Sequence, residues 1–201
     1  MLKNQLRILN LFRKDIFLKT SILQLAKKLN KAYPKVYEAI KYLEKNNILK
    51  SEKIGSSNII SLPLTIQSIA QLSFLEEQEA MEKKLPNYEK LMSIREISQY
   101  LLIVTGSYAK GKATKSSDLD LVIVIPDHEK AIDIQKLVEN ITLLFYPKIH
   151  LYVFNNKDII EMLLDEKENY GKEIFKSNII LKNAYIYYEL IREAIKNGFN
   201  G

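Results

Sequence analysis

Two aspartates, Asp118 and Asp120, have the residue type and the spacing best suited to chemistry in this chain. They open an apolar run, Leu119–Ile125, which is rich in Val and Ile and is typical of a buried strand. Residues two apart in a strand point to the same face, with Cα atoms about 6.5 Å apart, so the two carboxylates project together. Ionised carboxylates near a core are costly without a partner, and Mg²⁺ is a suitable partner. The pair therefore predicts a metal site at the start of a core strand.

A Gly-Ser pair, Gly106-Ser107, ends the preceding apolar run, Leu101–Val104. Glycine permits close approach of a ligand to the backbone. Ser107 offers a hydroxyl and an N–H, and a helix beginning here would direct further N–H groups at a phosphate. Together with the aspartates, these residues suit a metal-bound polyphosphate.

This pattern, a Gly-Ser pair, ten residues, and Asp118-x-Asp120 before an apolar strand, resembles the signature of the DNA polymerase beta-like nucleotidyltransferase superfamily. In spacing it is similar to the minimal nucleotidyltransferases. The resemblance implies that Gly106 and Ser107 hold the triphosphate, and we assign Lys110 to the same nucleotide site. It also implies that Asp118 and Asp120 bind Mg²⁺ (or Mn²⁺) and that a nucleoside monophosphate is transferred from ATP or another nucleoside triphosphate.

The superfamily carries a third carboxylate on a later strand, and this chain departs from that pattern. The matching strand is expected at Ile149–Phe154, where His150 takes the inward position and Tyr152 follows on the same face. The third acid usually helps bind the metal that activates the attacking hydroxyl. Its loss is expected to spare nucleotide binding more than chemistry. His150 is either a catalytic ligand or base, or a polar residue that the strand tolerates.

Composition restricts the class of protein. The 201 residues include no Cys, which excludes disulfides and thiolate metal sites and favours a cytoplasmic protein. No apolar run reaches transmembrane length, and the first residues lack the pattern of a signal peptide, so no membrane association is expected. With 47% hydrophobic and 27% charged residues, the chain is expected to be globular.

Charge is distributed unevenly along the chain. Residues 1–62 hold 13 Lys and Arg against 4 Asp and Glu, a net charge of +9, whereas residues 63–201 hold 17 against 20, a net charge of −3. This asymmetry predicts that the first segment meets a polyanion. A Lys-rich solvated surface is the alternative explanation.

The order of elements expected in this basic segment resembles a winged helix-turn-helix. Pro34 suits the first turn of the third helix, whose core stripe is Val36, Ile40 and Leu43. The expected elements are helices at Leu2–Phe17, at Ile22–Leu29 after an N-cap at Thr20 or Ser21, and from Pro34, then extended runs at Ile48–Lys53 and Asn58–Leu62 around the turn Gly55-Ser56-Ser57.

In such a module the third helix lies in the major groove of double-stranded DNA and the wing touches phosphates. Tyr33 and Tyr37 are either packing residues or DNA contacts, and winged helices also serve as dimerisation modules. The predicted DNA-binding residues are Lys31, Lys35, Tyr37, Lys41 and Tyr42 on or before the third helix, with Lys50 and Lys53 on the wing.

The remaining pattern predicts an α/β (α+β) protein in three parts. These are a winged helix-turn-helix at residues 1–62, a helical connector at 63–98, and a small mixed-sheet nucleotidyltransferase-like domain with a helical C-terminal tail at 99–201. A helix over His128–Ile141 is expected to turn Ile132, Leu137 and Val138 inward. The apolar connector favours packing on the catalytic domain or on a second copy, which makes a homodimer a candidate assembly.

Two functions remain open. The first is a Mg²⁺-dependent nucleotidyltransferase coupled to a DNA-binding winged helix. By resemblance to minimal nucleotidyltransferases it is antitoxin-like, with a toxin-like protein as acceptor. The second is a transcriptional regulator in which a catalytically degenerate nucleotidyltransferase fold senses nucleotide, as the missing third acid favours. The sequence predicts neither the acceptor nor the DNA site.

Overall fold

The computed structural model describes residues 3–55 and 57–201, which form a mixed α/β protein with two small sheets. The chain forms two compact units, one up to Leu75 with Asn200–Gly201 and the other over Glu76–Phe199. We call them the first and second units. Leu2 of the expected first helix and Ser56 of the expected turn lie outside the described residues. No helix in the described part of the chain has both the length and the apolar character needed to cross a membrane.

In its described residues the first unit contains three complete helices, the beginning of a fourth, and a small antiparallel sheet. The second helix has the predicted bounds because Ser21 caps it: the Ser21 hydroxyl accepts from the Gln24 N–H at 3.2 Å, and the Gln24 side chain accepts from the Ser21 N–H at 3.0 Å. Asn30, with φ of 49°, ends it in the left-handed region. The elements are α1 (Lys3–Lys14), β1 (Thr20–Ser21), α2 (Ile22–Leu29), α3 (Tyr33–Lys45), β2 (Lys50–Ile54) and β3 (Ser57–Ser61).

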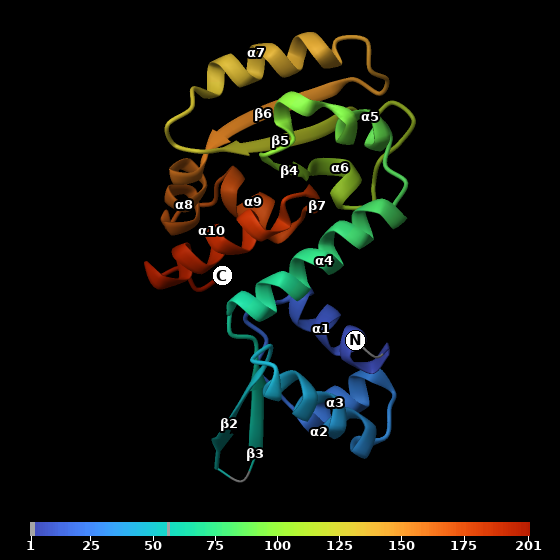
Figure 1. The fold of residues 1–201 in the computed structure, drawn as a ribbon, viewed down its shortest axis with the longest axis vertical. Helices are drawn as coiled ribbons and strands as arrows, with labels where there is room; N and C mark the ends of the chain where they lie inside the picture. The colour runs from blue at the N-terminus through green and yellow to red at the C-terminus, as the bar shows by residue number, and fades with distance from the viewer. Residues whose placement is uncertain (1–2, 56) are drawn as a thin grey trace. The chain divides into compact units, whose positions relative to one another are not determined.

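The sheet of this unit has the order β1-β3-β2, and Figure 1 shows the β2–β3 hairpin beside α2 and α3. The hairpin was predicted, but the two-residue strand β1, which pairs Thr20 with Ile60, was not. Helix α3 turns the predicted stripe inward, and the core comprises Ile8, Leu9, Phe12, Leu25, Val36, Ile40, Leu43 and Ile60.

Helix α4 (Ile66–Glu82) begins in the first unit and ends in the second, within the stretch expected as a connector. The other elements of the second unit are α5 (Tyr88–Ser93), a 3₁₀ turn (Arg95–Ile97), β4 (Leu101–Val104), α6 (Gly106–Ala109), β5 (Leu119–Ile125), α7 (Ala131–Thr142), β6 (Ile149–Asn155), α8 (Asn156–Leu164), α9 (Tyr170–Lys176), β7 (Ile179–Lys182) and α10 (Ala184–Lys196).

Four strands in the order β6-β5-β4-β7 form the sheet of the second unit. Strands β5 and β6 are parallel, and α7 provides the crossover that a parallel pair requires. Strand β4 is antiparallel to both β5 and β7, so the sheet is mixed, as predicted.

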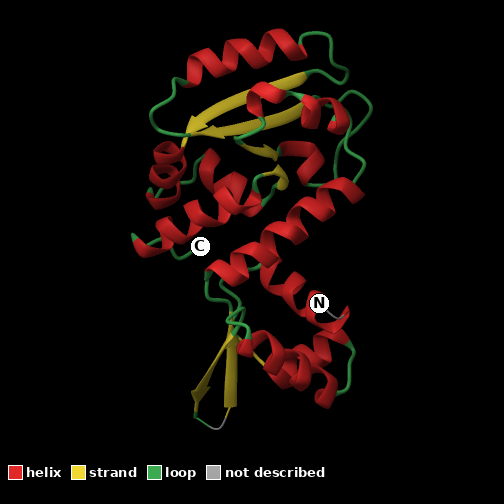
Figure 2. Cartoon of the chain, in the orientation of Figure 1, coloured by secondary structure: helices red, strands yellow, loops and turns green. Residues whose placement is uncertain are grey.

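Helices cover both faces of this sheet (Figures 1 and 2). One face packs against α5 and α7, through alternate residues of β5 such as Leu121 and Ile123 with Val138. The opposite face packs against α8, α9 and α10, where Leu101 and Val124 lie beside Ile174 and Ile191. Because strand residues alternate between faces, Asp120 shares this second face with Val124.

One detail of α7 was predicted wrongly. Val138 is buried, but the side chains of Ile132 and Leu137 are 54% and 38% exposed. The inward stripe is formed instead by Ile134, Val138 and Ile141, which are four and three residues apart. That spacing keeps one helical face toward the sheet, whereas Ile132 and Leu137 fall on its flanks.

Candidate functional site

The ends of β4 and β5 bring the Gly-Ser pair to the aspartates. The antiparallel ladder pairs Val104 with Leu121, and one step further the N–H of Thr105 donates to the carbonyl of Asp120 at 3.0 Å. The chain then leaves the sheet at Gly106 and makes the single turn of α6. Gly106 is thereby placed directly beside Asp120.

Gly106 and the Asp120 carboxylate are in close contact. A Cβ at position 106 would lie 1.9 Å from Oδ2 of Asp120 and 2.9 Å from its Cγ, so the carboxylate or the turn would have to shift to admit it. Gly106 also has φ of +63°, in the left-handed region that favours glycine. The close approach therefore requires glycine at this position, and it links two residues that the sequence had suggested only by motif.

Helix α6 carries Ser107, which is partly buried, but it is only four residues long. So short a helix has little dipole. Contacts to a phosphate would come instead from the Ser107 hydroxyl and local N–H groups. Before β5 the chain is held by a turn in which the Thr114 N–H donates to the Ser117 hydroxyl at 2.9 Å. After this turn Asp118 is exposed, directly before the start of the strand.

His150 occupies the strand position opposite Asp120, because β5 and β6 pair in parallel with Asp120 aligned to His150. Its Nδ1 lies 3.3 Å from Oδ1 of Asp120, and the histidine and aspartate side chains are 60% and 26% exposed. The Tyr152 hydroxyl is also 3.3 Å from Nδ1. The two oxygens of Asp120 thus face different partners: Oδ2 lies against Gly106 and Oδ1 lies toward His150.

Tyr170, at the start of α9, is a site residue that the sequence analysis missed. Its hydroxyl lies 2.8 Å from the Thr105 Oγ1, one residue before Gly106. The ring packs against Tyr152 and Phe154, with centroids 4.8 Å and 6.0 Å away. Burial, as the largest cause, raises the pKa of Tyr170 to about 12, and the charge of Asp120 contributes to the rise. Tyr170 is therefore a neutral hydroxyl at physiological pH.

Lys110, predicted to contact the nucleotide, follows α6 directly. In the structure its Nζ lies 2.5 Å from Oε1 of Glu173, on the same helix as Tyr170. Both side chains remain partly exposed, at 43% and 44%. Nothing in the local sequence around Glu173 indicates this contact, since the two residues are 63 apart in the chain.

The two aspartates, Asp118 and Asp120, are the candidate metal ligands of this site. In residues 3–55 and 57–201 no group of three or more His, Cys, Asp or Glu forms a ready-made metal site. Mg²⁺ commonly takes only one or two carboxylates from the protein and completes its shell with water and substrate phosphates. Asp118 and Asp120 fit a metal ion that arrives with a polyphosphate better than one held by protein alone.

The predicted DNA-binding residues belong to the first unit. All seven are exposed: Lys31, Lys35, Tyr37, Lys41, Tyr42, Lys50 and Lys53. Tyr33 and Tyr37 are 46% and 40% exposed and stack on each other with centroids 6.1 Å apart, so neither ring is part of the core. The Lys41 ammonium lies 5.6 Å from the Tyr37 ring centroid and 3.1 Å from Oε2 of Glu44.

Part of the chain matches a known protein family. Residues 89–187, close to half of the chain, match the family model described as a nucleotidyltransferase domain. No curated protein matches the chain. The matched range includes Gly106, Asp120, His150 and Tyr170, whereas the helices and hairpin of the first unit lie outside it. The match supports nucleotidyl transfer in general, and it agrees with the mixed sheet described above.

Proposed function

We propose that this chain, with a nucleotidyltransferase domain at residues 89–187, is a metal-dependent enzyme that transfers a nucleoside monophosphate from a nucleoside triphosphate, with ATP as the first candidate. The observation that carries the proposal is the close approach of Gly106 to the Asp120 carboxylate. It places Gly106, whose backbone a triphosphate can approach because it has no side chain, beside Asp120, whose carboxylate can bind the metal that accompanies the triphosphate.

Each side chain has a role in this proposal. Ser107 and Lys110 bind the triphosphate, and Asp118 and Asp120 bind the Mg²⁺ or Mn²⁺ that arrives with it. The metal, when bound, polarises the phosphate oxygens and offsets charge developing on them. An acceptor hydroxyl attacks the α-phosphorus, the bond to the β-phosphate breaks, and pyrophosphate leaves.

His150 is proposed as the base that takes the proton of the acceptor hydroxyl. Its Nδ1 faces Asp120 Oδ1 at 3.3 Å, which leaves Nε2 for the acceptor. A neutral imidazole can accept a proton at one nitrogen while the other donates to a carboxylate. In this proposal, His150 takes the role of the third acid of the DNA polymerase beta-like nucleotidyltransferases, which this chain resembles.

Nucleotide binding tests the metal and phosphate roles. Calorimetry with each of the four nucleoside triphosphates, with and without Mg²⁺, compares the wild type with Asp120→Asn. The control is Asp133→Asn, which removes an exposed carboxylate from α7 on the opposite face of the sheet. We expect Mg²⁺-dependent binding by the wild type and the control but not by Asp120→Asn. Equal binding by all three proteins would remove Asp120 from the site.

A second candidate function is a nucleotide-sensing transcriptional regulator. It is favoured by the histidine at position 150 and by the lack of a three-residue acidic cluster among the described residues. Nucleotide would then bind without being consumed. Transfer of a labelled nucleotide to an acceptor separates the enzyme from the sensor.

We further propose that the first unit is a winged helix that binds double-stranded DNA. The support is its net positive charge, the exposed Lys and Tyr side chains of α3, and the hairpin beside them. An antitoxin-like enzyme with a toxin-like protein acceptor, regulating its own synthesis, would use both units. A homodimer would let two such modules read paired half-sites.

Salt dependence tests the DNA proposal. For the full chain on duplex DNA, the logarithm of the affinity should fall steeply with the logarithm of the salt concentration. Lys35→Ala combined with Lys41→Ala should lower that slope by about 0.9 for each DNA phosphate that the variant no longer neutralises. Lys130→Ala combined with Lys136→Ala, which removes two exposed lysines at the start of α7 and within it, serves as the control for net charge. A slope lowered equally by the control would refute α3 as the binding element.

A further inference from the structure

Helix α9 contacts the chain on both sides of α6. The Tyr170 hydroxyl lies 2.8 Å from the Thr105 Oγ1, just before α6, and the Glu173 carboxylate lies 2.5 Å from the Lys110 ammonium, just after it. Residues three apart share one face of a helix, so a single face of α9 makes both contacts. The segment proposed to bind triphosphate is therefore spanned by α9.

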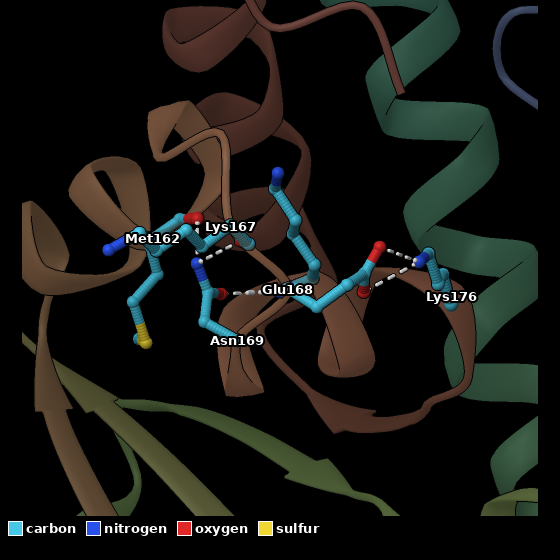
Figure 3. Close-up of polar contacts among 6 residues, drawn as sticks. Met162, Lys167, Glu168, Asn169 and Lys176 are labelled. Atoms are coloured by element: carbon cyan, nitrogen blue, oxygen red, sulfur yellow. Dashed lines mark hydrogen bonds and ion pairs between the residues drawn. The ribbon is translucent and has the colours of Figure 1, made fainter.

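The position of α9 is set by α8 and by the turn before it, not by Lys110. The Asn169 amide donates to the carbonyls of Met162 and Lys167, at 2.7 Å and 3.2 Å, and these contacts are drawn in Figure 3. The Asn169 Oδ1 also caps α9 by accepting from the Lys172 N–H at 3.1 Å. Gly171 packs so closely that a Cβ there would lie 2.5 Å from the Cβ of Met162.

A second ion pair lies on the same helix but does not involve Lys110: it joins Lys176, the last residue of α9, to Glu168, just before the helix. The Lys176 ammonium contacts both carboxylate oxygens of Glu168, at 2.8 Å and 2.9 Å (Figure 3). The contacts of Asn169 and Gly171 with α8 position α9 without help from Lys110, and the helix places Glu173 beside Lys110. A triphosphate that recruits Lys110 must then compete with the Glu173 carboxylate.

We propose that Glu173 is a latch on Lys110: it pairs with the ammonium in the nucleotide-free protein and yields it to the triphosphate. This inference rests on the proposed function only in placing a triphosphate at Lys110. The exchange is feasible because both side chains are over 40% exposed, and exposed ion pairs contribute little to stability. The latch lowers affinity in two ways, by occupying Lys110 and by repelling the phosphates.

Glu173→Gln is the direct test, because it removes the charge and keeps the shape of the side chain. The latch predicts that Mg²⁺-ATP and inorganic tripolyphosphate each bind about three- to tenfold more tightly to this variant in calorimetry. A gain in affinity distinguishes the latch from damage to the fold, which would weaken binding. The gain should shrink as salt is raised, since exposed charges are screened.

Two further variants isolate the mechanism. Glu168→Gln makes the same charge change just before the same helix, at a carboxylate that pairs with Lys176, and should leave both affinities unchanged. In a Lys110→Ala background, Glu173→Gln should lose most of its gain, as expected for residues that act through each other. Lys110→Ala alone should weaken binding.

The outcomes separate the latch from the proposed enzyme. Unchanged or weaker binding by Glu173→Gln overturns the latch, and so does an equal gain with Glu168→Gln, which would indicate a general field of negative charge. If neither ligand binds wild type or variant, the latch is wrong and Lys110 does not bind phosphate. If the gain is present but no labelled nucleotide is transferred, the latch stands and the proposed transferase activity fails.

Discussion

Gly106→Ala is the substitution for which the structure predicts the clearest effect. It adds one methyl group where the structure leaves no space, 1.9 Å from Oδ2 and 2.9 Å from Cγ of Asp120. It also places an L-residue at φ of +63°. The carboxylate must move away or the turn after β4 must open, and either change separates the phosphate segment from the metal ligand.

The expected magnitude has two parts. A non-glycine residue in the left-handed region costs about 1–2 kcal/mol. Forcing an extra methyl group into a filled site adds about 1–3 kcal/mol. Gly111→Ala is a matched control, because Gly111 has nearly the same φ, +65°, but a Cβ there meets nothing within 4 Å. Gly111→Ala should therefore lower the free energy of unfolding only by the backbone cost of about 1–2 kcal/mol.

Urea unfolding of both variants measures these costs, and calorimetry measures the affinity of each variant for Mg²⁺-ATP. We expect Gly106→Ala to be less stable than Gly111→Ala by about 1–3 kcal/mol and to lose Mg²⁺-dependent nucleotide binding, whereas Gly111→Ala keeps it. If the two variants are equally stable and bind nucleotide equally, the Asp120 carboxylate does not lie against Gly106, and the site as described is wrong.

Two hydroxyls of the second unit give further predictions. The pKa of Tyr170 is raised to about 12 in the folded protein, which means that the fold favours the neutral hydroxyl. The contribution of this hydroxyl to the free energy of unfolding is therefore fully present below the ordinary pKa of 10.0 and is lost as the pH rises toward about 12. The difference in free energy of unfolding between wild type and Tyr170→Phe should therefore fall between pH 8 and pH 11 by less than about 1.4 kcal/mol, because the ring is partly exposed. A difference that does not change with pH would contradict the raised pKa of Tyr170. Buried Tyr188 donates to the Glu76 carboxylate at 2.7 Å, so Tyr188→Phe should lower the free energy of unfolding by about 1–3 kcal/mol; no loss in urea unfolding would show that this carboxylate is satisfied without it.

Local signals in the sequence were sufficient for most elements. The apolar runs Leu101–Val104 and Leu119–Ile125 are strands with those bounds, and the cap predicted at Thr20 or Ser21 gave the start of α2, which Ser21 caps. These features depend on residues close together in the chain, so a pattern reveals them. The pairing of β5 with β6 also agrees with the expectation that His150 takes the position of the missing acid, although its role stays a prediction.

The contacts of α9 could not be predicted in the same way. Tyr170 meets Thr105 across 65 residues, and Glu173 meets Lys110 across 63. Asn169 was a usable sign that a helix starts at Tyr170. The order of the strands and the close packing at Gly171 decide which strand end α9 approaches. Neither can be recognised from the sequence around α9. The strand β1 was not predicted, because two residues are too few to show the alternation of buried and exposed side chains that is typical of a strand.

Nucleotidyl transfer by the second unit is the central claim, and one measurement tests it most directly. Nucleoside triphosphates labelled at the α-phosphate are incubated with Mg²⁺, an extract of the source cell as the supply of acceptors, and either wild type, Asp118→Asn or Asp120→Asn. We predict label on a discrete protein or nucleic acid with the wild type and none with either variant. Label that is equal with all three proteins, or absent with the wild type although Mg²⁺-nucleotide binds, would contradict transfer at this site, and the second result would favour a nucleotide sensor.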